Sequence, residues 1–151
     1  TDQPVDFIGT LENDLEQVLR AAQLVVVTLP HTRRTDGLIG ARELGWMRED
    51  AILINVARGP ILQEDALYEH LTSHPKFTAG LDVWWTDPFS VEPFVLKHPF
   101  LDLPNVIGTP SISAIAGDSL LVGARRAAEN VLRYLKGESP RGLVRRDDYS
   151  G

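Results

Sequence analysis

The stretch AILINVARGPILQEDALYEHL, residues 51–71, joins an apolar run to a glycine–proline turn and an amphipathic segment. The run 51–56 is almost continuously apolar, which predicts a strand buried on both faces. Residues 63–71 predict a helix, because Glu64 and Asp65 occupy its first turn, where the helix dipole favours acidic side chains. Arg58 therefore stands where a buried strand ends, and this order of elements is typical of an α/β fold.

The same alternation extends in both directions along the chain. Apolar runs predict further strands at 5–8, 24–29, 77–83 and 105–109. Helical spacing predicts helices at 10–22, with Thr10 as the cap, at 41–47 and at 118–136. Apolar strands that alternate with helices indicate a parallel sheet with helices on both faces.

Composition excludes several classes of function. The chain has 151 residues, of which 43% are hydrophobic and 24% are charged, and its net charge of −6 argues against a non-specific nucleic-acid surface. No apolar run approaches the roughly 20 residues of a membrane span, and no signal peptide is visible. Cysteine is absent, which excludes disulfides and thiolate chemistry and fits a cytoplasmic protein. We predict no metal site, and we interpret the basic cluster 141–146, followed by two aspartates, as a solvated tail.

Polar residues gather at the predicted carboxyl ends of the strands. These ends carry 28–30, 56–58, Asp82 and 109–113. Polar residues can end any strand, but ligands of open parallel sheets bind at this edge. Four such ends together favour a functional site.

Four motifs in this order resemble the second half of the nucleotide-binding domain of D-2-hydroxyacid dehydrogenases. They are AILINVARGPILQEDALYEHL (51–71), TAGLDVW (78–84), LPNVIGTPSIS (103–113) and AAENVLRYLKGESP (127–140). The resemblance extends from Val5 to about Gly142. It implies the second half of a Rossmann-like dinucleotide-binding domain at 1–137 with a C-terminal tail at 138–151. It also implies NAD or NADP as the cofactor and a small 2-keto or 2-hydroxy acid as the substrate.

The resemblance assigns roles to individual residues. Arg58 falls on the catalytic arginine, which can bind a carboxylate through two hydrogen bonds and polarise the neighbouring carbonyl; a structural ion pair is the alternative. Asp82 matches the acidic residue near the nicotinamide. The remaining positions that are expected to line the cofactor, together with Arg58, are Pro30, Thr35, Val56, Ala57 and Ser113.

Two positions depart from the family pattern. Ser111 stands where the family has its catalytic histidine, and an unassisted hydroxyl is a poor proton donor. Asp87 stands where the family usually has the glutamate that orients this histidine, and its side chain is one methylene shorter; the alternative is that the Asp-Pro pair starts a turn. His31 is the only plausible substitute donor, since His98 is interpreted as structural. We therefore expect this chain to be a weak catalyst or an inactive one.

The glycine-rich G-x-G-x-x-G turn of a dinucleotide fold is absent from these 151 residues. By the resemblance it lies upstream, and the strand at 24–29 would then present an unpaired apolar edge. Three explanations of this edge are open. The chain is a fragment, a separate chain supplies the missing half, or two copies pair their edges in a homo-oligomer. Two functions follow: part of an oxidoreductase, or a non-catalytic binding or assembly module.

Trp84, Trp85 and Phe89 could wall a substrate pocket, although a packing cluster is the commoner role for such residues.

Overall fold

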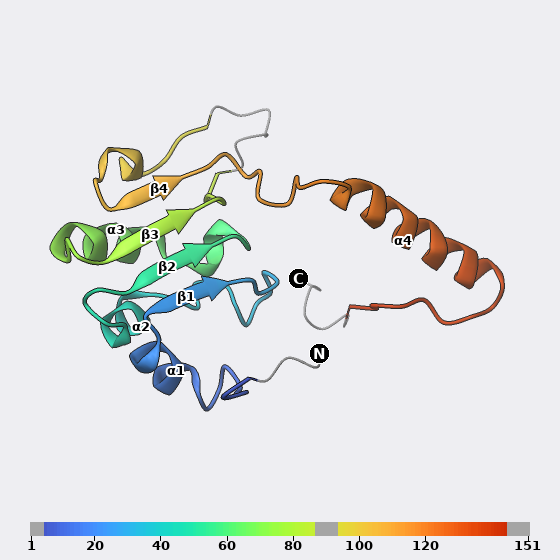
Figure 1. Ribbon diagram of the computed structural model, residues 1–151, viewed down its shortest axis with the longest axis horizontal. Coiled ribbons are helices and arrows are strands. Elements are labelled where there is room, and N and C mark those ends of the chain that lie inside the picture. Colours follow the sequence, from blue (N-terminus) through green and yellow to red (C-terminus); the bar gives the residue numbers. More distant parts are fainter. Residues whose placement is uncertain (1–4, 87–93, 145–151) are drawn as a thin grey trace.

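Four parallel strands form one sheet (Figure 1). The computed structural model describes residues 5–86 and 94–144. The strands β1 (Leu24–Val27), β2 (Ile52–Asn55), β3 (Thr78–Leu81) and β4 (Val106–Gly108) lie in the order β1-β2-β3-β4. Their last residues are aligned, because Val27 pairs with Asn55, Asn55 with Leu81, and Leu81 with Gly108. The predicted α/β fold with a parallel sheet is therefore confirmed, and all four carboxyl ends meet at one edge.

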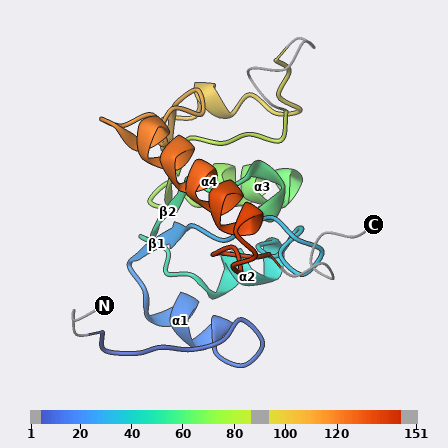
Figure 2. The same cartoon turned by 90° about the vertical axis from the view of Figure 1, so that its right-hand side faces the viewer.

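Helix α1 (Leu15–Ala21) precedes β1. Helices α2 (Ala41–Trp46) and α3 (Glu64–Ser73) connect β1 to β2 and β2 to β3, and short 3-10 turns lie at Gly59–Ile61 and Phe100–Asp102. Figure 2 shows α2 and α3 on one side of β1 and β2. The hydrophobic core lies between these helices and the sheet. It includes Leu53 and Ala79 of the sheet, Leu44 of α2 and Leu67 of α3, and all four are fully buried.

The opposite face of the sheet is exposed in the described part of the chain. Alternate strand residues point to opposite faces, and the exposed set is apolar: Leu24 (54% exposed), Val26 (49%), Ile52 (40%) and Ile107 (69%). The expected helical cover is thus present on one face only. At the edge, β1 pairs with β2 alone among the described strands, as predicted.

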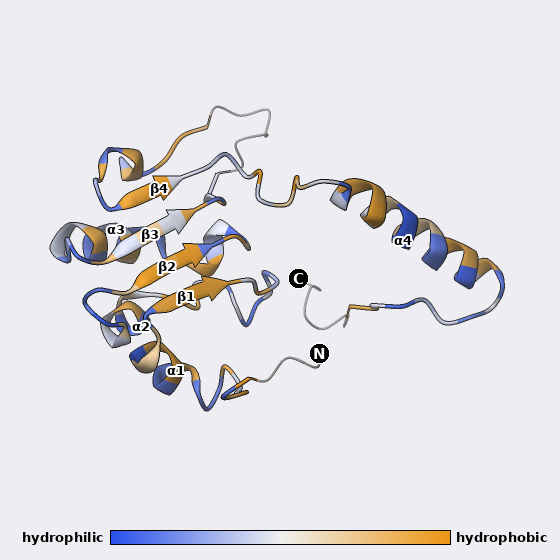
Figure 3. Cartoon of the chain, in the orientation of Figure 1, coloured by the Kyte–Doolittle hydropathy of each residue, from blue (hydrophilic) through white to orange (hydrophobic). Residues whose placement is uncertain are grey.

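The last helix, α4 (Ser119–Leu135), stands apart from the sheet (Figure 1). Figure 3 shows an apolar stripe along it and polar residues opposite. No residue of α4 is buried, and the exposed stripe includes Leu121, Val131, Leu132 and Leu135. None of the helices in the described part combines the length and apolarity of a membrane span.

Two predictions at the start of the chain are wrong. Residues 5–8 are irregular rather than a strand, since no neighbouring strand pairs with them. The first helix begins at Leu15 instead of Thr10, because the Asp14 carboxylate accepts a hydrogen bond from the Thr10 amide (2.8 Å) and closes a turn there. The other elements match their predicted bounds within two residues.

We expect Gly59→Ala to destabilise the fold. A Cβ atom on Gly59 would overlap the backbone of Trp84, which cannot move without disturbing the end of β3. The cost of such overpacking is roughly 1–3 kcal/mol, measured as a lower urea midpoint at unchanged slope. Gly45→Ala is the matched control, because a Cβ at this exposed position of α2 meets nothing within 4 Å. It should stabilise the helix by about 0.5–1 kcal/mol, and equal losses in both variants would contradict the packing argument.

Candidate functional site

The turn after β2 is organised by the side chain of Asn55. This side chain is fully buried. Its Oδ1 accepts a hydrogen bond from the Ala57 amide (3.0 Å), and its Nδ2 donates to the Arg58 carbonyl oxygen (3.0 Å). Both ends of the amide are thus used to fix the backbone from which Arg58 projects. Sequence reasoning missed this role, although an asparagine inside a buried apolar run was the available signal.

Arg58 presents its guanidinium group at the surface of this edge. Its Nη1 donates to the Ala57 carbonyl oxygen (2.6 Å), which leaves the other N–H donors of the group available. Among the described residues, no carboxylate lies within 4.0 Å of Arg58. Arg58 therefore has no acidic partner for a structural ion pair in the described part of the chain.

A cavity of about 580 Å³ lies at the ends of β1 and β2. Its lining brings together four of the predicted site residues, namely Pro30, Val56, Ala57 and Arg58, with Thr28, Leu29 and His31. Thr35 lies behind this wall rather than on it. It is 5% exposed, and its hydroxyl donates to the Pro30 carbonyl oxygen (2.7 Å) and accepts from the Thr32 amide (2.8 Å). Thr35 thus shapes the loop that presents Pro30.

His31 is paired with an acid on the rim of the same cavity. Its Nε2 lies 2.7 Å from Oδ1 of Asp36. A hydrogen bond to an acid of this kind orients the imidazole ring. The substitute donor suggested by the sequence thus shares a cavity with Arg58.

Asp82, at the end of β3, is buried and tied to the loop after β4. Its Oδ1 accepts from the Thr109 hydroxyl (2.5 Å) and the Ile112 amide (3.0 Å), and its Oδ2 accepts from the Ser113 amide (2.9 Å). Burial alone would raise the pKa of Asp82, but hydrogen bonds from Ser113, Thr109 and Ile112 outweigh it and lower the pKa to about 2. The carboxylate is therefore charged at neutral pH and holds two strand ends together.

Ser111 lies on the loop that wraps Asp82. Its amide donates to the Asp82 carbonyl oxygen (2.7 Å), and its φ of 57° lies in the left-handed region. The loop thus brings Ser111 and Ser113 to Asp82. Arg58 follows the end of the neighbouring strand, β2, because the Asp82 amide donates to the Asn55 carbonyl oxygen (3.1 Å). Asp87 and Phe89 lie outside the described residues.

The aromatic residues after β3 serve packing. Trp84 is 7% exposed and donates its indole N–H to the Thr109 carbonyl oxygen (2.9 Å), and Trp85 stacks on Phe100 (5.3 Å between ring centroids). His98 stacks on Tyr68 and contacts Asp65, as its structural interpretation predicts. In the described ranges, no cluster of three or more His, Cys, Asp or Glu could hold a metal ion.

Comparison with known proteins gives a consistent assignment. Residues 2–113 match the family model for the D-isomer specific 2-hydroxyacid dehydrogenase, NAD binding domain. A glyoxylate/hydroxypyruvate reductase B from Pectobacterium carotovorum is 39% identical over 131 residues, which are 87% of this chain and 39% of that protein. The chain therefore spans well under half the length of this relative.

Solved structures agree with the sequence match. A D-isomer specific 2-hydroxyacid dehydrogenase from Xanthobacter autotrophicus, in complex with NADPH and MES, superposes with a TM-score of 0.74 at 34% identity, over 87% of this chain and 52% of that one. D-lactate dehydrogenase with NAD+ from Lactobacillus jensenii gives 0.69 at 28% identity, over 87% and 42%. The chain thus belongs to the D-isomer specific 2-hydroxyacid dehydrogenase family, within its NAD-binding domain.

Proposed function

We propose that the chain forms the substrate-carboxylate and nicotinamide side of an NAD(P)-dependent D-2-hydroxyacid dehydrogenase. The observation that carries the proposal is Arg58. A guanidinium group with available donors projects from a turn that Asn55 holds rigid, and it lines a cavity at the ligand-binding edge of a parallel sheet. A group that is placed before the ligand arrives loses little freedom on binding.

Arg58 would bind the carboxylate of a 2-keto acid through two parallel hydrogen bonds. The adjacent carbonyl oxygen gains negative charge as the carbonyl is reduced, and the same cation stabilises that charge. Lysine would supply a point charge without the planar fork. The substrate class follows from this pairing of a carboxylate with a neighbouring carbonyl.

The residues present fit the nicotinamide end of the cofactor, which supplies the hydride when it is bound. The apolar side chains of Pro30, Val56 and Ala57 line the cavity beside Arg58. The charged carboxylate of Asp82 lies at the same edge of the sheet and is a hydrogen-bond acceptor of the kind that a carboxamide N–H binds. The phosphate-binding glycine turn is not in these residues, so this fit concerns the nicotinamide end alone. Preference for NAD or NADP stays open.

Proton transfer is the weak step of this site. The Ser111 hydroxyl has no acidic or basic partner among the described residues, and it replaces the titratable group that the family pattern places there. His31 with Asp36 offers the nearest alternative in the same cavity as Arg58. We infer that the chain by itself is a weak catalyst or an inactive one.

A non-catalytic binding or assembly module is the second candidate. The exposed apolar face that includes Leu24, Val26 and Ile107, together with the free edge of β1, favours it. Such surfaces promote association with a second copy or with another chain that adds a strand to this edge. A saturable increase of NADH fluorescence with the chain alone would favour the enzyme over the module.

We expect Ser111→His to increase the rate of NADH-dependent glyoxylate or hydroxypyruvate reduction. General acid catalysis contributes about 10²–10⁴-fold, and histidine is among the residues that tolerate the left-handed backbone of position 111. The measurement is kcat, at NADH concentrations that saturate fluorescence.

Ser111→Asn, which tolerates the same left-handed backbone but has no titratable group, is the matched control and should give no gain. Arg58→Gln in the Ser111→His background should raise KM for the keto acid, since the carboxylate loses its partner. His31→Gln lowers the residual rate of the natural chain only if His31 donates the proton. No gain from Ser111→His would refute the assignment of position 111.

We expect Asp82→Asn to destabilise the fold in a pH-dependent way. The folded pKa of about 2 lies below the ordinary 3.8, so the carboxylate stabilises the fold above about pH 4, and this contribution is lost as the pH falls towards 2. A shift of this size corresponds to about 2 kcal/mol.

The measurement for Asp82→Asn is the difference in unfolding free energy from the natural chain, determined in urea between pH 6 and pH 2. This difference should shrink below about pH 4. Asp118→Asn is the control, since this exposed side chain makes no capping hydrogen bond. A difference for Asp82→Asn that stays constant over the whole range would contradict the stabilisation by the charged form.

A further inference from the structure

A basic face runs along α4, far from the sheet edge. Arg126, Asn130 and Arg133 are spaced four and three residues apart, so they lie on the same side of the helix. These residues lie beyond 2–113, the part that the family model matches.

Asn130 anchors the chain that follows the helix. Its Nδ2 donates to the Arg141 carbonyl oxygen (2.8 Å), and its Oδ1 accepts from the Arg141 amide (2.8 Å). The return is possible because Gly137 and Gly142 adopt left-handed φ values of 75° and 68°. A second contact, from Nε of Arg133 to the Ser139 carbonyl oxygen (2.8 Å), secures the returning segment. The described part of the tail is therefore attached to α4 rather than solvated throughout.

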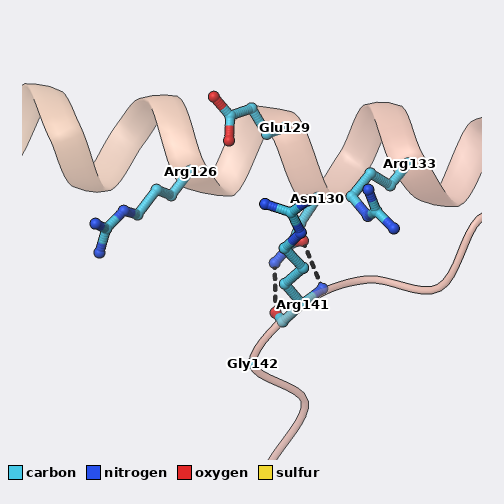
Figure 4. A pocket seen from close by; sticks show the side chains of 6 residues that line it. All are labelled: Arg126, Glu129, Asn130, Arg133, Arg141 and Gly142. Carbon is cyan, nitrogen blue, oxygen red and sulfur yellow. Dashed lines mark hydrogen bonds between the residues drawn. The ribbon is translucent and has the colours of Figure 1, made fainter. Parts of the chain in front are cut away.

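This attachment brings a third guanidinium group to the face of α4. Figure 4 shows Arg141 between Arg126 and Arg133, below the helix, while the carboxylate of Glu129 points to the other side. Together with Asn130 and Gly142, these residues line a cavity of about 590 Å³. Side chains separated by eight or more positions in the sequence thus converge on one space.

Three arginines and one acidic residue, Glu129, line this cavity, so its lining carries a net positive charge. Arg133 pairs with Glu138 (3.1 Å between Nη1 and Oε2). Among the residues that the structure describes, neither Arg126 nor Arg141 has a carboxylate within 4.0 Å. Like charges that line one cavity repel one another, so an anion that bridges them is favoured.

We propose that Arg126, Arg133 and Arg141 bind a phosphate group, either as free phosphate or as a phosphomonoester. The planar fork of arginine matches phosphate oxygens through paired hydrogen bonds. The cavity is wider than a phosphate ion needs, which leaves room for an attached organic group. The site is separate from the cavity of Arg58, and the proposal of phosphate binding does not depend on the proposed enzymatic role.

The test is a phosphate titration of the full chain, followed by NMR of the arginine Nε–H signals at constant ionic strength. We expect saturable shifts for Arg126 and Arg141. Arg126→Gln and Arg141→Gln should each weaken binding about tenfold, the effect of losing one charge-assisted hydrogen bond. Asn130→Ala should weaken it as well, because Arg141 is then no longer held in place.

Arg125→Gln is the matched control: it removes the same charge from the neighbouring exposed position of α4, outside the cavity lining. It should leave binding unchanged. Tighter binding of glycerol phosphate than of inorganic phosphate would identify a phosphomonoester as the ligand, and equal affinity would identify free phosphate; both support the site. Equal weakening by Arg125→Gln, shifts that chloride reproduces, or the absence of saturation would overturn it.

Discussion

Parallel pairing is the constraint on which this structure depends. Each strand must be entered from the same end, so every connection has to carry the chain back across the sheet. The connections here place α2 and α3 on one face and leave the ends of β1, β2, β3 and β4 side by side. Residues that are far apart in the sequence, such as Pro30, Arg58, Asp82 and Ser111, reach one edge for this reason alone.

The two main charges of that edge are held in opposite ways. The carboxylate of Asp82 is buried and accepts hydrogen bonds from the loop after β4, so it stabilises the architecture. The guanidinium group of Arg58 is exposed: Asn55 fixes its backbone, one hydrogen bond to the Ala57 carbonyl oxygen holds Nη1, and the other donors are available. A site needs both arrangements, because a ligand gains most from a group that is positioned by its neighbours and still has donors to offer.

Sequence reasoning located the sheet, and four of the residues that it predicted for the site line one cavity at the edge of that sheet. Apolar runs such as 51–56 favour buried strands, and the positions of the four observed strands were predicted within two residues. Residues 5–8 are also mostly apolar, but a strand exists only where another strand supplies hydrogen bonds, and that partner is not a local property. The roles of Asn55 and Thr35 were also hidden, because a side-chain hydrogen bond depends on the turn that it stabilises.

The exposed apolar face of the sheet has a consequence for how the chain unfolds. Leu24, Val26, Ile52 and Ile107 are already partly in contact with water in the folded state, as is the apolar stripe of α4. Unfolding therefore uncovers less new apolar surface than in a domain of this length with two covered faces. Both the heat-capacity increment and the slope of unfolding free energy against denaturant scale with that newly uncovered surface. The free energy of unfolding of this chain should accordingly depend only weakly on temperature, and it should fall only slightly on cooling.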